Sequence, residues 1–172
     1  DQAYLSHPPH CTLYYGTLSS IDEWQIALTT EMGGHCGFNT HTVENFAFYD
    51  DPLADYGHTI AIRIESHPCL FTLQLAVAKA LQPHIRRDLS PPTSSLVEQS
   101  PFRESFEEYN FPFVGEHWIP HFTISSLAIE RNSPLISELL DASPHFEIPV
   151  HQLSIWQING DHHDKLATLP LA

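Results

Sequence analysis

A short pattern of residues that could perform acid–base chemistry occurs twice in this chain. It reads His-Cys-Thr-Leu at residues 10–13 and His-Phe-Thr-Ile at residues 121–124. With 13 His and 11 Thr among 172 residues, chance alone gives His-x-Thr about 0.8 times, and roughly 0.15 times when the second and fourth residues must be apolar. Two copies therefore indicate a paired site.

If each copy forms a β-strand, its side chains alternate between two faces. Each strand would then carry its His and Thr on a polar face, while its two apolar residues pack into the core beneath. The expected polar faces consist of His10, Thr12 and Tyr14 in the first copy and of His121, Thr123 and Ser125 in the second.

Two such histidines could transfer both protons of a phosphodiester hydrolysis. An imidazole titrates near pH 6.5, so one ring can remove a proton from an attacking oxygen while the other donates one to a leaving oxygen. A nearby threonine hydroxyl can donate to a nonbridging phosphate oxygen. The pattern therefore predicts His10 and His121 as the catalytic acid and base, in an order left open, and Thr12 and Thr123 as phosphate-binding residues. The competing interpretation is that both histidines are ordinary, partly buried strand residues.

The paired motifs resemble those of the 2H phosphoesterase superfamily, which includes bacterial RNA 2′,5′-ligase-like proteins and eukaryotic 2′,3′-cyclic nucleotide phosphodiesterases. The stretch from Trp118 to Ile124 is most similar, because an aromatic residue and a proline precede the second motif. The resemblance implies a bilobal α+β fold, with two mainly antiparallel sheets and flanking helices related by a pseudo-twofold axis around a central groove. It also implies metal-independent cleavage of a cyclic phosphate or a 2′-linked phosphodiester.

These observations together predict a metal-independent phosphodiesterase without a cofactor. Its expected substrate is a small cyclic phosphate, such as a 2′,3′-cyclic nucleotide or an RNA end, or a 2′,5′-linked nucleotide. Two other hypotheses stay open. One is a noncatalytic nucleotide-binding or interaction domain with the same fold, and the other is a metal-assisted hydrolase, which lacks an H-x-x-x-H spacing on any expected helix.

Three further residues are possible substrate contacts: Tyr14, Trp118 and Ser125. Either aromatic ring could stack on a nucleobase, although aromatic residues in strands more often belong to the core. His117 lies close to Trp118 in the sequence and could border the site.

The charge balance bears on the substrate. The chain has a formal net charge of −14, with only 7 Lys and Arg against 21 Asp and Glu. A protein that grips long nucleic acid by its backbone usually presents a basic surface. We therefore expect a small nucleotide or an RNA end as the substrate, and no long duplex as a partner.

Length and composition predict one domain at residues 1–172, in the form of a monomer. No apolar run is long enough to span a bilayer, so we expect a soluble protein without a membrane partner. The three cysteines have no CxxC spacing and cannot all pair, which favours free thiols in the cytoplasm or nucleus over secretion. The start at Asp1 is compatible with a trimmed, excised or mature form.

Glycine, proline and capping residues place the expected elements. The expected lobes are approximately residues 1–85 and 101–172, connected by the Ser- and Pro-rich segment 86–100. Each reads as a motif strand, a short helix and two strands. The expected helices start near Ser20, Pro68, Pro101 and Ser133, and the expected strands beyond the motifs are 42–49, 58–65, 146–150, 153–158 and 166–169.

Two basic or metal-like clusters have ordinary interpretations. Asn159-Gly160 predicts a hairpin turn, so His162-His163 should lie in a solvated loop after it rather than bind a metal. Arg86-Arg87 could meet a substrate phosphate, but more simply ends a helix and neutralises its dipole.

Overall fold

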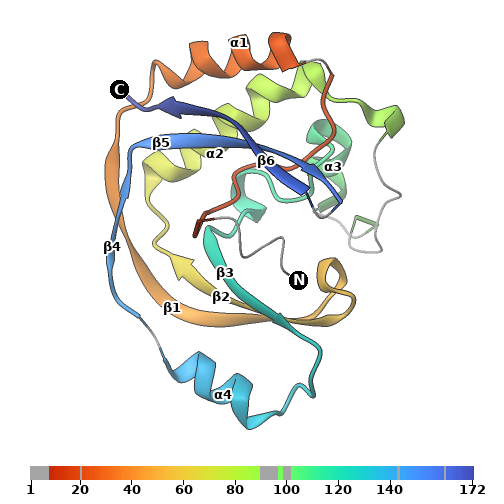
Figure 1. The fold of residues 1–172 in the computed structure, drawn as a ribbon, viewed down its shortest axis with the longest axis vertical. Helices are drawn as coiled ribbons and strands as arrows, with labels where there is room; N and C mark the ends of the chain where they lie inside the picture. The colour runs from red at the N-terminus through yellow and green to blue at the C-terminus, as the bar shows by residue number, and fades with distance from the viewer. Residues whose placement is uncertain (1–7, 20, 90–96, 99–101, 143, 161) are drawn as a thin grey trace.

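The structure is a computed structural model that describes residues 8–19, 21–89, 97–98, 102–142, 144–160 and 162–172. Its described elements form an α+β fold with a four-stranded sheet and a separate hairpin (Figure 1). The helices are α1 (Ile21–Met32), α2 (Pro68–Leu81), α3 (Phe102–Tyr109) and α4 (Pro134–Asp141); the strands are β1 (Phe38–Asp51), β2 (Gly57–Ile64), β3 (His121–Leu127), β4 (Glu147–Val150), β5 (Gln152–Asn159) and β6 (His162–Pro170).

All four expected helices are present, and local signals explain their ends. Helix α1 ends at Met32, directly before Gly33-Gly34, where two glycines in succession disfavour further helix. Helix α2 begins at Pro68, where a missing backbone N–H costs nothing, and the His67 ring accepts a hydrogen bond from the backbone N–H of Cys69. None of the helices in the described ranges is long and apolar enough to cross a membrane.

The four-stranded sheet has the order β3-β2-β1-β4, and all of its pairs are antiparallel. Register shifts interrupt the long strand β1, which curves around one side of the molecule in Figure 1. The inner strands come from the first half of the sequence and the outer strands from the second. The four-stranded sheet therefore contains strands from both expected lobes. The division into lobes at 1–85 and 101–172 stays a prediction.

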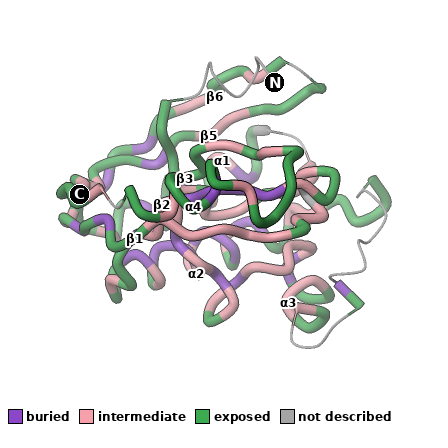
Figure 2. The backbone as a smooth tube through the Cα atoms, turned by 90° about the horizontal axis from the view of Figure 1, so that it is seen from below, coloured by how far each residue is buried: buried purple, intermediate pink, exposed green. Residues whose placement is uncertain are grey.

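The largest hydrophobic cluster lies between helices α1 and α2 and the β5–β6 hairpin. Trp24, Leu28 and Met32 on α1 pack with buried residues of α2 and with Leu153 and Leu169 of the β5–β6 hairpin. Figure 2 shows exposed and half-buried positions toward the free end of that hairpin. In the described part of the chain, the buried residues of the hairpin thus lie at the end that contains Leu153 and Leu169.

The first motif does not form the expected strand. Residues 9–16 run without regular secondary structure, and the nearby ladder contact is an isolated bridge between Leu18 and Ile85. Two features explain the difference. Pro8 and Pro9 have no backbone N–H to offer a neighbouring strand, and the Thr12 carbonyl accepts its hydrogen bond from the Trp118 indole, at 3.0 Å.

The expected loop at His162-His163 is also wrong. The hairpin turn at Asn159-Gly160 is confirmed, with Gly160 at a φ of 58°. Strand pairing resumes at once, because Asn159 lies opposite His162 and Ile158 opposite His163. The two histidines therefore begin β6.

Most of the expected connection 86–100 lies outside the described residues. At its start, Arg86 forms an ion pair with Asp88 at 2.7 Å. Arg87 donates to the carbonyls of Phe106 and Glu108 at the end of α3. Arg87 thus does neutralise a helix end, but the helix is one that follows it in the chain.

Candidate active site

The structure brings the two motifs into direct contact. The Trp118 indole donates to the Thr12 carbonyl at 3.0 Å, and Cys11 and Phe122, one from each motif, pack against the same buried cluster around Trp118. Burial raises the pKa of the Cys11 thiol to about 12, so this thiol stays protonated and is no nucleophile. In Figure 1 the described chain accordingly starts beside the first residues of β3.

Both histidines are anchored in the same way. His10 Nδ1 lies 3.0 Å from the carbonyl oxygen of Pro8, and His121 Nδ1 lies 2.7 Å from that of Ile119. In each case the carbonyl belongs to the residue two positions earlier. A carbonyl oxygen only accepts hydrogen bonds, so Nδ1 carries the hydrogen and Nε2 becomes the proton acceptor of the neutral ring. The two motifs therefore hold their histidine rings in the same tautomer, with the hydrogen on Nδ1.

The two rings differ in burial. His10 is exposed, whereas His121 is half-buried. Burial lowers the pKa of His121 below its ordinary value, and Arg63 and His10 lower it further, while the Ile119 carbonyl and Asp51 act to raise it. The lowered pKa favours the neutral ring of His121 at pH 7, with Nε2 able to accept a proton.

The threonines of both motifs have exposed side chains. Thr123 lies opposite Ala61 in the β2–β3 register and His121 lies opposite Arg63, so both point to one face of the sheet. Within the described ranges, neither Thr12 nor Thr123 uses its hydroxyl in a hydrogen bond. Both hydroxyls can therefore donate to a phosphate oxygen.

Two of the expected substrate contacts are core residues. The Tyr14 hydroxyl donates to the Tyr109 carbonyl at 2.6 Å, and burial raises the pKa of Tyr14 to about 12. Trp118 is only 4% exposed and packs with Ile64 and Leu70. The buried Trp118 ring and the anchored, half-buried Tyr14 ring are therefore accounted for by packing.

Ser125 does not share the face of His121, because β3 contains a bulge. Thr123 pairs with Ala61, but the next pair joins Ser125 to Ile60, which leaves Ile124 as an extra residue. Ile124 is 44% exposed instead of packing into the core as expected. Because of the bulge, Ser126 instead of Ser125 lies on the face of His121. The hydroxyl oxygens of Ser126 and Thr59 are 3.0 Å apart.

Three neighbours of His121 are not among the site residues expected from the sequence. The ring centroids of Phe48 and Phe46 lie 5.3 Å and 6.0 Å from that of His121, and Arg63 is its partner on β2. One signal could have revealed Arg63. The expected strand 58–65 contains Arg63, and the alternation of side chains along a strand places it on the face opposite to Ile62.

The other expected clusters lie elsewhere. His117 contacts the Phe102 ring and lies 3.7 Å from Glu116. Among the residues that the structure describes, no group of three or more His, Cys, Asp or Glu could hold a metal ion.

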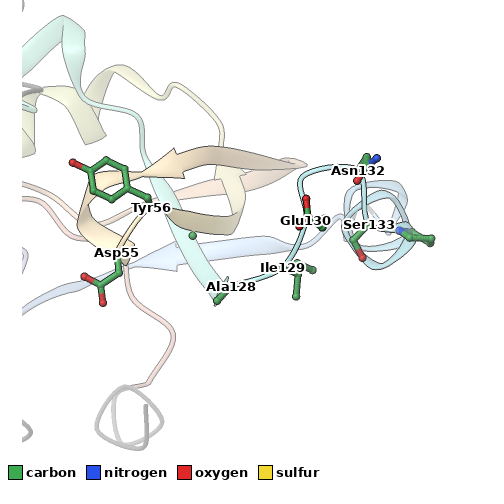
Figure 3. A pocket seen from close by; sticks show the side chains of 9 residues that line it. Asp55, Tyr56, Ala128, Ile129, Glu130, Asn132 and Ser133 are labelled. Carbon is green, nitrogen blue, oxygen red and sulfur yellow. The ribbon is translucent and has the colours of Figure 1, made fainter.

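A hollow of about 790 Å³ lies beyond the far end of β3 (Figure 3). Its lining includes Asp55, Tyr56, Glu130 and Ser133. It contains neither of the anchored histidines, and its two carboxylates would repel a phosphate. We therefore place the candidate active site at the two motifs.

The fold and the paired motifs define a protein of the 2H phosphoesterase type. The fold is shared with the crystal structure of TT0787 of Thermus thermophilus, with a TM-score of 0.57 and 13% identity over 95% of this chain and 78% of that one. The family model of the 2′-5′ RNA ligase superfamily matches residues 1–162. The chain belongs to this superfamily. No curated protein matches it.

Proposed function

We propose that this protein is a phosphodiesterase that hydrolyses a small cyclic phosphate or a 2′,5′-linked nucleotide by two-histidine acid–base catalysis. The observation that carries the proposal is the matched anchoring of His10 and His121, each through Nδ1 to the carbonyl two residues earlier, on segments that the Trp118–Thr12 hydrogen bond joins. Family membership supports phosphoesterase chemistry of this type.

The geometry supports one assignment of the two protons. His121, with its lowered pKa, takes a proton from the attacking water at Nε2. The water oxygen bonds to phosphorus and the bond to one ribose oxygen breaks, while protonated His10 gives its proton to that oxygen. Thr12 and Thr123 donate to the nonbridging oxygens, where charge develops. Water is consumed, and a proton exchanged with solvent restores both rings.

The net charge of −14 supports a small substrate or an RNA end over a long duplex. Because the acidic surface repels further phosphates, the net charge also favours a terminal phosphate over one in the middle of a nucleic-acid chain. We therefore take 2′,3′-cyclic nucleotides and 2′,5′-linked dinucleotides as the substrates to test.

The test incubates the protein with both substrate classes in the presence of a chelator and separates the products by chromatography. Turnover that survives chelation and disappears in His10→Ala and His121→Ala supports the proposal. Nucleotide binding without turnover would favour a noncatalytic domain, and loss of turnover on chelation would favour metal-assisted hydrolysis. Turnover of the 2′,5′-linked substrate alone would keep the mechanism and narrow the substrate.

A further inference from the structure

Arg63 stands at the candidate active site without a role in the mechanism above. It is the direct partner of His121 in the β2–β3 register, so both side chains leave the sheet on one face. Across β2 and β1, the same face carries Ala61 and Phe46, which are also register partners. Ala61 has no side chain beyond Cβ, which leaves room for larger neighbours above it.

The guanidinium of Arg63 is held in place from two sides. Its Nε donates to Glu44 Oε1 at 3.0 Å, and its central carbon lies 4.4 Å from the centroid of the Phe46 ring. Phe46 in turn contacts Phe48 and His121 by ring edges. An arginine fixed in this way loses little conformational entropy when it binds a ligand.

Arg63 keeps its terminal nitrogen atoms for a ligand. Glu44 takes only Nε, and no other residue in the described ranges accepts a hydrogen bond from Arg63. The side chain remains 35% exposed. Its Nη1 and Nη2 can therefore donate to an incoming anion while the side chain stays anchored.

The remaining arginines are engaged elsewhere. Each forms an ion pair or caps a helix away from β3, as in Arg86 with Asp88, Arg87 with the end of α3, Arg103 with Glu107 and Arg131 with Asp50. A chain with this excess of acidic residues thus keeps one anchored arginine in register with His121.

We propose that Arg63 is a third phosphate-binding group of the site, which binds an oxygen of the substrate phosphate through its Nη atoms. Threonine hydroxyls supply dipoles alone, whereas a guanidinium adds a full positive charge where negative charge accumulates on the phosphate. The ligand class is a ribose phosphate, either cyclic or a monoester product. The identity of the reaction rests on the proposed function, but binding of the phosphate requires no turnover.

The competing explanation is that Arg63 only ties β2 to β1 through Glu44 and Phe46. Binding of adenosine 2′-monophosphate, adenosine 3′-monophosphate and adenosine, measured by calorimetry, separates the two. Arg63→Gln should weaken binding of the better monophosphate about tenfold to a hundredfold, the size of a charge-assisted hydrogen bond, and should leave any adenosine binding unchanged. Arg63→Lys should recover part of this loss.

Arg131 provides a matched control. It also lies over a ring of β1, with its central carbon 4.2 Å from the centroid of Tyr49, and it also pairs with an acid, Asp50. Arg131→Gln should bind the monophosphate as the unchanged protein does. Glu44→Gln removes the ion pair but keeps the phosphate donors, so it should bind the monophosphate at least as tightly.

A second readout is the titration of His121 by NMR. The charged or titratable groups that act on its ring are Arg63 from β2, Asp51 from the end of β1 and His10 from the first motif. Loss of the positive charge in Arg63→Gln should raise the pKa of His121. A shift of this sign would show that the positive charge of Arg63 acts at the ring of His121, as a group that binds the same phosphate must, while the binding measurements separate phosphate binding from a role in tying strands together.

Equal monophosphate affinity in folded Arg63→Gln and in the unchanged protein would overturn the proposal, as would an equal loss in Arg131→Gln. If Arg63→Gln fails to fold, the comparison rests on Arg63→Lys and Glu44→Gln, where a parallel loss in both would overturn it. Phosphate binding that depends on Arg63 in a protein without turnover would refute the proposed function and support this inference. Unchanged binding and KM in an active Arg63→Gln variant would refute the inference alone.

Discussion

The indole N–H of Trp118 donates to the Thr12 carbonyl at 3.0 Å, across 106 positions of the chain. This bond joins the residue three positions before His121 to the residue two positions after His10. It replaces the strand pairing that the first motif lacks. Trp118 is buried and is thus one of the side chains that set the placement of one histidine relative to the other, together with Gln74, which donates to the Leu13 carbonyl.

Trp118→Phe should therefore affect both stability and activity. Phenylalanine keeps much of the packing but leaves the Thr12 carbonyl without its donor, which should cost about 1–3 kcal/mol in the free energy of unfolding. The first motif should then move, and turnover should fall more than substrate affinity. Denaturant unfolding and steady-state kinetics measure both effects. Trp156→Phe, the same change in the β5–β6 hairpin, is the control and should leave turnover near normal.

The thiols report on the same contact. All three cysteines are free, with Cys36 and Cys69 exposed and Cys11 beside His121. With a pKa of about 12, the Cys11 thiol is almost wholly protonated at pH 8. We expect two thiols to react rapidly with a disulfide reagent and the third to react only on unfolding. A rapid third thiol in the folded protein would show that the two motifs separate in solution.

The environment of His121 predicts the acid limb of the pH profile. A base must be deprotonated, so kcat/KM rises as the pH increases through the pKa of His121, which lies below its ordinary value of 6.5. Asp51 raises this pKa, so Asp51→Asn should move the limb to lower pH. Arg63 lowers it, so Arg63→Gln should move the limb to higher pH. Shifts in one direction in both variants would contradict the assignment of His121 as the base.

The same shift has a consequence for stability. The unfolded chain binds a proton at His121 near pH 6.5, while the folded chain binds it only at lower pH. The contribution of His121 to the free energy of unfolding therefore falls as the pH drops below 6.5. His121→Gln should show a smaller loss of stability between pH 7 and pH 5 than the unchanged protein, measured by chemical denaturation.

Local signals predicted most of the fold, and contacts between distant segments account for what they missed. Proline and glycine at helix ends are read from neighbouring residues, and the four helices were found where they indicated. The bulge at Ile124 depends on how β3 aligns with β2, which the sequence of β3 alone does not encode. The first motif avoids a strand because a distant indole takes the Thr12 carbonyl.

In the candidate site, too, local signals predicted some residues, and contacts between distant segments determine the others. The repeated motif indicated His10 and His121, and the structure places their segments in contact. The exchange of Ser125 for Ser126 follows from the bulge, and the position of Arg63 follows from strand register. Tyr14 is of a residue type that can stack on a base, but its hydroxyl donates to the Tyr109 carbonyl, a contact between distant segments that the sequence does not reveal.

The double mutant of the two histidines tests whether they act as one unit. His10→Ala and His121→Ala should each lower kcat by roughly 10² to 10⁴, the contribution of one proton-transfer group, with the fold intact by circular dichroism. Because proton removal and proton donation occur in one displacement, the double mutant should lose far less than the product of the two single losses. His35→Ala, a half-buried histidine paired with Glu31 at 3.7 Å, is the control and should keep normal turnover. Losses that multiply in full would mean that the two rings act in separate steps, and near-normal turnover in either folded single mutant would remove that histidine from the catalytic pair.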